Sequence, residues 1–430
     1  MGPDAGDQGR SLELDFATPA EPRYHKRTLV QHEYIRTPAQ LHRFCEQLSS
    51  ASMIGFDTEF VSEDTYRPDL CLIQVAADEH LAVIDPRDVR DVTPFWEAIC
   101  TGDHLTVVHA GREEFRFCFH AMRKRPQRLF DIQIAAGLIG LEYPASYGKL
   151  LQKLLDVELP KGETRTDWRR RPLSPRQIEY AIQDVTYLKP LYDCLHARLD
   201  TLGRLSWMDD EMTRWQTELE EFELRENWRR VSGSTGLSEK AMVIVRELWR
   251  WREAEAEAQN RPPRRVLRDD LLVELARRGK SDPQQIRAIR GIERSLSKRH
   301  FDAVADCIQR ALALPRSEWP TRPPRKPSSH GSLVGQFIAT ALGSICRSLE
   351  LAPSLVGTVQ DVRDLVEYRL VPPAANEDDP APALAMGWRA AVVGRTIDDL
   401  LAGNLALRIR NPRADDPITL ERVAGESQSD

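Results

Sequence analysis

Two acidic residues at the end of an apolar run constrain this chain more than any other feature. Met53–Phe56 is apolar, and Asp57, Thr58 and Glu59 follow it directly. Side chains alternate along a strand, so a strand here would direct Asp57 and Glu59 to one face and Thr58 to the other. Crowded carboxylates repel each other unless a cation neutralises them, and hard oxygen ligands suit Mg²⁺ or Mn²⁺. The pair is weak evidence alone, because most such pairs are solvated strand ends.

The pattern around this pair predicts an α/β domain. Short apolar runs indicate strands, whereas apolar residues three or four positions apart indicate helices. Strand signals occur at Ala51–Phe56, Leu70–Ala77, His80–Ile84 and Leu105–His109, and helix signals at Arg112–Met122, Asp131–Gly140 and Tyr147–Leu155. Strands at hairpin spacing, followed by alternating strands and helices, predict a mixed sheet flanked by helices.

A second chemical signal lies on a well-marked helix. Ser174 is a good N-cap, Pro175 suits the first helical position, and Gln177 completes a capping box. This helix would carry Tyr180 and Asp184 four residues apart and therefore on one face. In isolation this would more often be a surface pair, but with the acidic pair it forms a recognisable set.

These motifs, in this order, resemble those of the ribonuclease D family, 3′→5′ exonucleases of the four-carboxylate class with a tyrosine in the third motif. The resemblance rests on Ile54–Phe60, Val108–Gly111, Phe130–Gln133, Leu159–Lys161, Arg165–Trp168, Arg171–Leu173 and Tyr180–Leu188. It implies that the α/β domain is an RNase H-like exonuclease domain that releases nucleoside 5′-monophosphates from RNA 3′ ends.

The resemblance also implies a set of site residues. Asp57, Glu59, Glu114 and Asp184 would hold two divalent cations, Mg²⁺ or Mn²⁺. Tyr180 would orient or deprotonate the attacking water.

One of these positions departs from the family pattern. The family has an aspartate five residues after the histidine at His109, and this chain has Glu114 there. A glutamate carboxylate reaches about one C–C bond further, a shift large enough to mistune one ion of a metal pair about 3.5–4 Å apart. The alternatives are therefore an active exoribonuclease and a weakly active or inactive RNA-binding protein on the nuclease scaffold. A third is a DNA 3′→5′ exonuclease, because no residue identified here reads a 2′-hydroxyl.

The rest of the chain is mostly helical and divides by charge. Residues 231–330 hold 21 basic against 13 acidic residues, whereas residues 331–430 hold 9 against 14. Trp251–Glu253 and Arg264–Asp270 resemble the family's small helicase-and-RNase-D C-terminal (HRDC) domain, and Gly387–Arg389 suggests a second, divergent copy. We expect a flexible tail at 1–27, the exonuclease domain at 28–205, a helical connector at 206–235, an HRDC domain at 236–315, a Pro/Arg-rich linker at 316–330, a second all-α HRDC-like domain at 331–415 and a disordered tail at 416–430.

The basic unit predicts contact with a polyanion. Arg264, Arg265 and Arg268 are candidates for neutralising RNA phosphates upstream of the trimmed end. Gln74 and Lys161 are candidate substrate contacts through the resemblance, with surface roles equally open. The family implies tRNA precursors or other structured RNA with accessible 3′ ends as substrates, and a monomeric protein.

Other classes of protein fit the sequence less well. The seven cysteines are scattered and include no C-x-x-C pair, which argues against a disulfide scaffold or a thiolate zinc site. We expect neither a signal peptide nor a membrane span, because neither end nor interior carries a suitable apolar run. A cytoplasmic protein is therefore expected.

Overall fold

The computed structural model describes residues 31–159, 166–296, 298–321, 331–370, 381–413 and 417–423. The predicted tail at 1–27 and residues 322–330 of the predicted linker lie outside these ranges. Within them, no helix is both long and apolar enough to cross a membrane.

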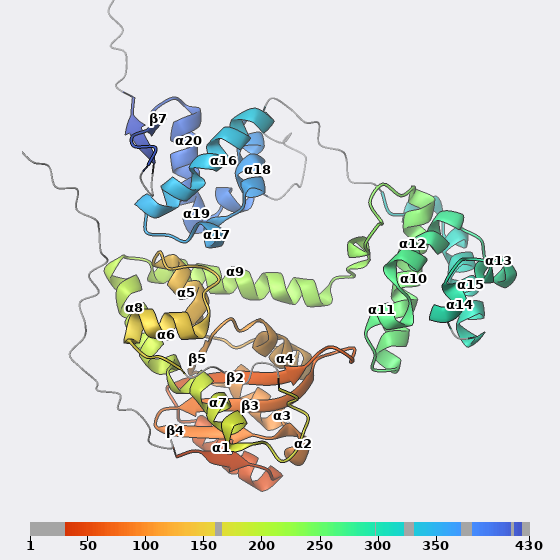
Figure 1. Ribbon diagram of the computed structural model, residues 1–430, viewed down its shortest axis with the longest axis horizontal. Coiled ribbons are helices and arrows are strands. Elements are labelled where there is room, and N and C mark those ends of the chain that lie inside the picture. Colours follow the sequence, from red (N-terminus) through yellow and green to blue (C-terminus); the bar gives the residue numbers. More distant parts are fainter. Residues whose placement is uncertain are drawn as a thin grey trace, which may run out of the picture.

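A six-stranded mixed sheet forms the centre of the N-terminal domain, in the order β1-β4-β3-β2-β5-β6 (Figure 1). The strands are β1 (Glu33–Ile35), β2 (Met53–Val61), β3 (Asp69–Ala77), β4 (His80–Ile84), β5 (Leu105–Val108) and β6 (Leu129–Asp131). Strand β2 is antiparallel to β3 and parallel to β5. The acidic pair therefore lies in the second half of a central strand, which continues two residues beyond Glu59 to Val61, and the predicted mixed sheet is confirmed.

Helices cover both faces of this sheet. One face packs on α1 (Pro38–Leu48), α2 (Pro86–Val89), α3 (Thr93–Thr101) and α4 (Arg112–Met122); the other packs on α5 (Ile132–Leu138), α6 (Tyr147–Leu155), α7 (Pro175–Thr186) and α8 (Leu188–Thr201). Side chains of β2 alternate between these layers, since Ile54 and Phe56 enter the α1–α4 core while Met53 enters the opposite one. Helix α7 begins with the predicted capping box of Ser174 and Gln177.

An independent helical unit follows a long connector. The connector is α9 (Leu205–Leu224) with a short 3₁₀ turn, η1 (Trp228–Arg230); the unit comprises α10 (Glu239–Ala258), α11 (Pro263–Val266), α12 (Asp269–Arg278), α13 (Pro283–Arg287), α14 (Ile292–Ser295) and α15 (Lys298–Ala313), and η2 (Arg316–Glu318) follows it. This unit has its own hydrophobic core and stands apart at the end of α9 (Figure 1). It meets the loop between β2 and β3, where Arg67 forms a 2.9 Å ion pair with Glu257.

The last part of the chain is mostly helical but ends in a hairpin. It contains α16 (Gly331–Ser348), α17 (Pro353–Val356), α18 (Val359–Leu370), η3 (Ala383–Ala385), α19 (Gly387–Arg389), η4 (Ala390–Gly394), α20 (Arg395–Leu401), β7 (Leu405–Ile409) and β8 (Ile418–Arg422). The hairpin differs from the expected all-α domain at 331–415 and tail at 416–430. The alternating apolar pattern of these two strands is short and gives a weak strand signal. The hairpin forms because the paired residues Leu407 and Leu420 pack against the core.

This last unit shares one hydrophobic core with the N-terminal domain. Arg389 makes two hydrogen bonds, of 2.5 and 3.0 Å, to the carboxylate of Glu211 on α9, and both residues are buried. Arg204 donates to the carbonyl oxygens of Leu138, Leu349 and Glu350. This second helical unit, residues 331–423, is thus held against α5 and α9 by buried contacts. The first helical unit, residues 239–318, has a separate core.

Candidate active site

The predicted site residues come from three elements that meet at the carboxyl end of β2. Strand β2 carries Asp57 and Glu59, and α7 carries Tyr180 and Asp184. Close packing brings these elements together because Gly55 has no side chain. A Cβ atom added at Gly55 would lie 2.9 Å from Leu188 Cδ1, closer than packed carbon atoms approach. The glycine therefore permits the α7–α8 junction to lie directly against the acidic strand.

The acidic groups on β2 and α7 all have raised pKa values. Burial, and then the charge of Asp184, raise the pKa of Asp57 to about 8. Burial and the three neighbouring carboxylates raise the pKa of Glu59 to about 9. Burial raises that of Asp184 to about 7, although a hydrogen bond from Tyr180 acts in the opposite direction. Such shifts are typical of carboxylates that are buried close to one another.

Glu114 reaches the site from α4, on the other side of β2. Its Oε1 accepts a 2.5 Å hydrogen bond from Thr58 Oγ1, and both residues are only 5% exposed. Burial and the charge of Asp57 raise the pKa of Glu114 to about 8. In the described part of the chain, no three or more His, Cys, Asp or Glu residues lie close enough together to hold a metal ion. The acidic groups therefore influence one another's pKa values without converging on one point.

Tyr180 keeps its proton at neutral pH. Burial and the charge of Asp184 raise the pKa of this phenol, and the two side chains are hydrogen-bonded. Trp168, which is 4% exposed, packs beside it with ring centroids 6.1 Å apart. The indole therefore holds the phenol in place from within the core.

A small cavity of about 40 Å³ adjoins the carboxylates. Asp57, His109, Tyr147, Asp184 and Leu188 line it. His109 lies 3.0 Å from the carbonyl oxygen of Ala145 through its Nε2, and its ring packs on Tyr147. Sequence reasoning missed Tyr147, since it belongs to none of the motifs and reaches the site only because α6 packs against α8.

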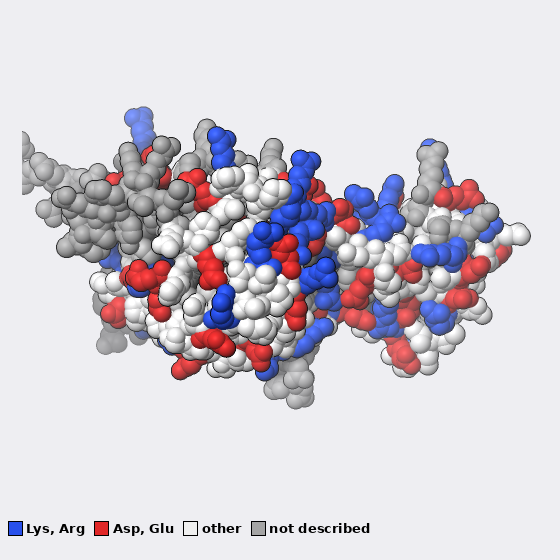
Figure 2. All heavy atoms as spheres, turned by 90° about the horizontal axis from the view of Figure 1, so that it is seen from below, with Lys and Arg blue, Asp and Glu red and all other residues white. Residues whose placement is uncertain are grey.

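The candidate substrate contacts are placed differently. Gln74 is fully buried beside Asp57, and Lys161 lies outside the described residues. Arg264, Arg265 and Arg268 are exposed on the first helical unit. Arg264 pairs with Asp269 at 3.0 Å and Arg268 pairs with Asp270. Figure 2 shows basic side chains gathered where the N-terminal domain faces this unit, and basic and acidic side chains mixed over the unit itself.

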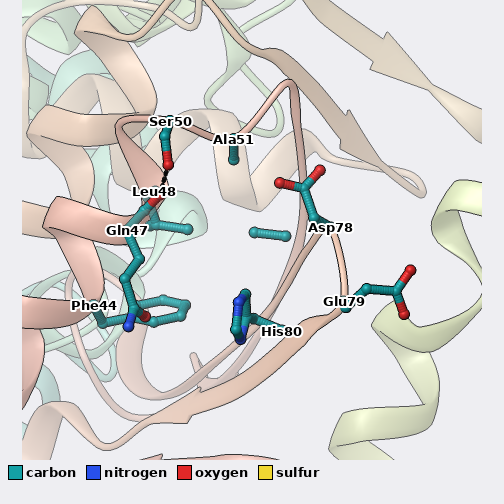
Figure 3. Close-up of a pocket in the computed structure, with 9 residues that line it drawn as sticks. Phe44, Gln47, Leu48, Ser50, Ala51, Asp78, Glu79 and His80 are labelled. Atoms are coloured by element: carbon teal, nitrogen blue, oxygen red, sulfur yellow. Dashed lines mark hydrogen bonds between the residues drawn. The ribbon is translucent and has the colours of Figure 1, made fainter.

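A larger cavity lies at the opposite end of β2. It has a volume of about 260 Å³ and is formed by the end of α1 and the β3–β4 turn, where Ala77 pairs with Ile54. Figure 3 shows Phe44 and Leu48 on one side and exposed Asp78, Glu79 and His80 on the other. It contains none of the predicted site residues.

Fold and acidic cluster together define a class: a 3′–5′ exonuclease domain followed by an HRDC domain. The 3′-5′ exonuclease family matches residues 32–200, and the HRDC domain family matches residues 242–308. The likeness extends beyond the separate domains.

Whole relatives align with nearly all of the chain. Ribonuclease D of Sphingobium indicum is 34% identical over 393 residues, covering 89% of this chain and 97% of the relative. Ribonuclease D of Zymomonas mobilis is 32% identical, and the alignment covers 88% of this chain and 96% of the relative. The crystal structure of Escherichia coli RNase D superposes with a TM-score of 0.75 at 26% identity, and the superposition covers 86% of this chain and 99% of that one. That protein is described as an exoribonuclease involved in structured RNA processing. The chain belongs to the ribonuclease D family and is a 3′–5′ exoribonuclease.

Proposed function

We propose that Asp57, Glu59, Glu114 and Asp184 bind two divalent cations, Mg²⁺ or Mn²⁺, and that this site hydrolyses the last phosphodiester of an RNA 3′ end. The carrying observation is the set of four carboxylates with raised pKa values around the end of β2. An all-oxygen donor set favours hard cations. When bound, such cations supply an activated water and charge neutralisation at the phosphate.

Tyr180 orients the water in this proposal and does not deprotonate it. Its phenol is protonated at neutral pH because burial and the charge of Asp184 raise its pKa. A neutral phenol can donate one hydrogen bond and accept others. Its bond with Asp184 and its contact with Trp168 keep the hydroxyl in one position.

The glutamate in the second motif is compatible with activity. Thr58 donates to Oε1 of Glu114 only, and a carboxylate has a second oxygen that can accept or ligate. The longer side chain therefore supports both the hydrogen bond and a ligand role. The whole-length similarity to named ribonucleases D also favours the enzyme over the binding-protein alternative.

The proposed substrates are structured RNAs with accessible 3′ ends, tRNA precursors among them, and the products are nucleoside 5′-monophosphates. Arg264, Arg265 and Arg268 would neutralise phosphates upstream of the trimmed end, so affinity should fall as salt rises. Lys161 would contact the substrate near the site. We propose that the protein acts as a monomer.

The test is a timed digest of 5′-labelled RNA carrying a single-stranded 3′ tail, with Mg²⁺, with Mn²⁺ and with chelator. Wild type and Asp57→Asn are compared, and a DNA of the same sequence serves as the second substrate. A metal-dependent ladder that shortens from the 3′ end on RNA, and that Asp57→Asn abolishes, is expected. A ladder that persists unchanged in Asp57→Asn contradicts the proposed site, and preferential digestion of DNA contradicts the proposed substrate.

A further inference from the structure

The side-chain amide of Gln74 is buried next to the proposed site. Gln74 is 0% exposed. Neither Oε1 nor Nε2 makes a hydrogen bond to any group among the described residues. A buried amide that makes no hydrogen bond costs folding free energy, because it gives up its bonds to water and gains none in return. An apolar side chain of similar size would avoid that cost.

The sheet register places this amide beside Asp57. Gln74 on β3 pairs directly with Asp57 on β2, and with Val83 on β4. Directly paired residues of antiparallel strands share one face, with Cβ atoms about 4.5–5.5 Å apart. Val83 packs with Ala181 and Ile182 of α7, so the Gln74 side chain lies beneath α7 between an apolar neighbour and an acidic one.

From this placement we propose that Gln74 is a positioning residue for Asp57, its Nε2 donating a hydrogen bond to the ionised Asp57 carboxylate when the site holds divalent cations. This inference rests on the proposed role of Asp57 as a ligand. A hydrogen bond to a ligating carboxylate would hold its orientation and favour the cation-loaded site. Complete burial beneath α7 argues against direct contact between Gln74 and RNA.

The test separates a functional amide from a packing residue. Gln74→Met keeps the approximate shape and removes the amide. Its Mn²⁺ affinity, measured by titration calorimetry on the full chain, is expected to fall about tenfold or more, the usual cost of losing a partner of a metal ligand. Its melting temperature in chelator is expected to stay the same or rise, because the unpartnered amide is gone.

Gln216→Met is the matched control. Gln216 lies on α9, outside the carboxylate cluster. It is also buried, but its Nε2 donates a 3.4 Å hydrogen bond to the carbonyl oxygen of Pro126. This change is expected to lower the melting temperature in chelator and to leave Mn²⁺ affinity unchanged.

Unchanged Mn²⁺ affinity in Gln74→Met overturns the proposal, whatever happens to the melting temperature. A weaker affinity accompanied by a lower melting temperature in chelator also overturns it, because the amide then acts through packing. Asp57→Asn distinguishes the two levels of failure. If it binds Mn²⁺ as wild type does, the site assignment itself is wrong; if it loses binding while Gln74→Met does not, only the role of Gln74 is wrong.

Discussion

Thr58 Oγ1 donates a 2.5 Å hydrogen bond to Glu114 Oε1, joining the strand of the acidic pair to α4. Thr58 stands between Asp57 and Glu59 in the sequence but faces the opposite side of the sheet. An aspartate at position 114 would be shorter by about one C–C bond and would not span the same gap without a backbone shift. The unusual glutamate is thus matched to a contact that this chain makes.

Removing the Thr58 hydroxyl should destabilise the protein. Thr58→Val leaves the buried Glu114 carboxyl without its donor, which costs about 1–3 kcal/mol of unfolding free energy. Thr58→Ser keeps the hydroxyl and is expected to retain most of the stability. Urea denaturation in chelator measures both, and equal stability of Thr58→Val and wild type would show that the hydrogen bond contributes nothing.

Glu114→Gln should retain the fold and lose most of the activity. The amide can still accept from Thr58 but lacks the charge to hold a cation, which contributes several kcal/mol in such sites. We expect kcat to fall about 100-fold or more at saturating Mg²⁺, with each 1.36 kcal/mol equal to a factor of ten. A wild-type kcat in Glu114→Gln would exclude Glu114 as a cation ligand. Another residue would then have to supply the fourth ligand.

Tyr180→Phe should affect turnover and not binding. The substitution removes the hydroxyl that bonds Asp184 but keeps the ring that packs on Trp168. Positioned proton donors and acceptors contribute about 10²–10⁴-fold to rates, and we expect a loss near the lower end of that range. Single-turnover digestion gives the rate, with RNA affinity in chelator as the control. A loss of affinity without a loss of rate would make Tyr180 a substrate contact.

Stability of the metal-free protein should fall as pH rises from about 5 to about 9. Carboxyls in the unfolded chain lose their protons near pH 4, whereas those of Asp57, Glu59, Glu114 and Asp184 do so only at about 7 to 9 when folded. The folded state therefore binds more protons across this window, and the free energy of unfolding decreases with pH.

Melting temperatures in chelator at pH 5, 7 and 9 measure this trend. Asp57→Asn should flatten it, since one titrating group is removed. Added Mn²⁺ should raise the melting temperature most at high pH, because cation binding requires deprotonated ligands. A melting temperature in chelator that does not fall between pH 5 and pH 9 would contradict the raised pKa values of these carboxyls.

The second helical unit should prove necessary for the fold of the nuclease domain. Arg389→Met removes one of the two arginines that pair with the buried Glu211 and leaves Arg214 as the other. Breaking a buried pair completely costs about 3–5 kcal/mol, so we expect a loss of about 2–3 kcal/mol here. Arg369→Met, which breaks the partly exposed pair with Asp398 in the same unit, should cost less than about 1 kcal/mol. Similar denaturation midpoints for the two variants would show that the buried pair does not fasten the unit.

Local patterns in the sequence were enough to predict the α/β architecture of the N-terminal domain, whereas its nuclease activity was inferred from the resemblance of its motifs to those of the ribonuclease D family. Apolar runs and the capping box at Ser174 act within a few residues and do not depend on distant packing. They predicted the mixed sheet and the helix that carries Tyr180 and Asp184. The placement of Asp57 and Glu59 on one face followed from strand alternation alone.

Tertiary structure decided the rest. The contact of Thr58 with Glu114, the burial of Gln74 and the joining of Tyr147 to the site depend on which elements pack together, and no local pattern encodes that. The same holds for the second helical unit. Its sequence pattern predicts helices, but its place in the nuclease core depends on packing against α5 and α9. The first helical unit instead has a hydrophobic core of its own. Secondary-structure propensity depends on residues that are close together in the sequence, whereas burial depends on contacts between segments that are far apart in it.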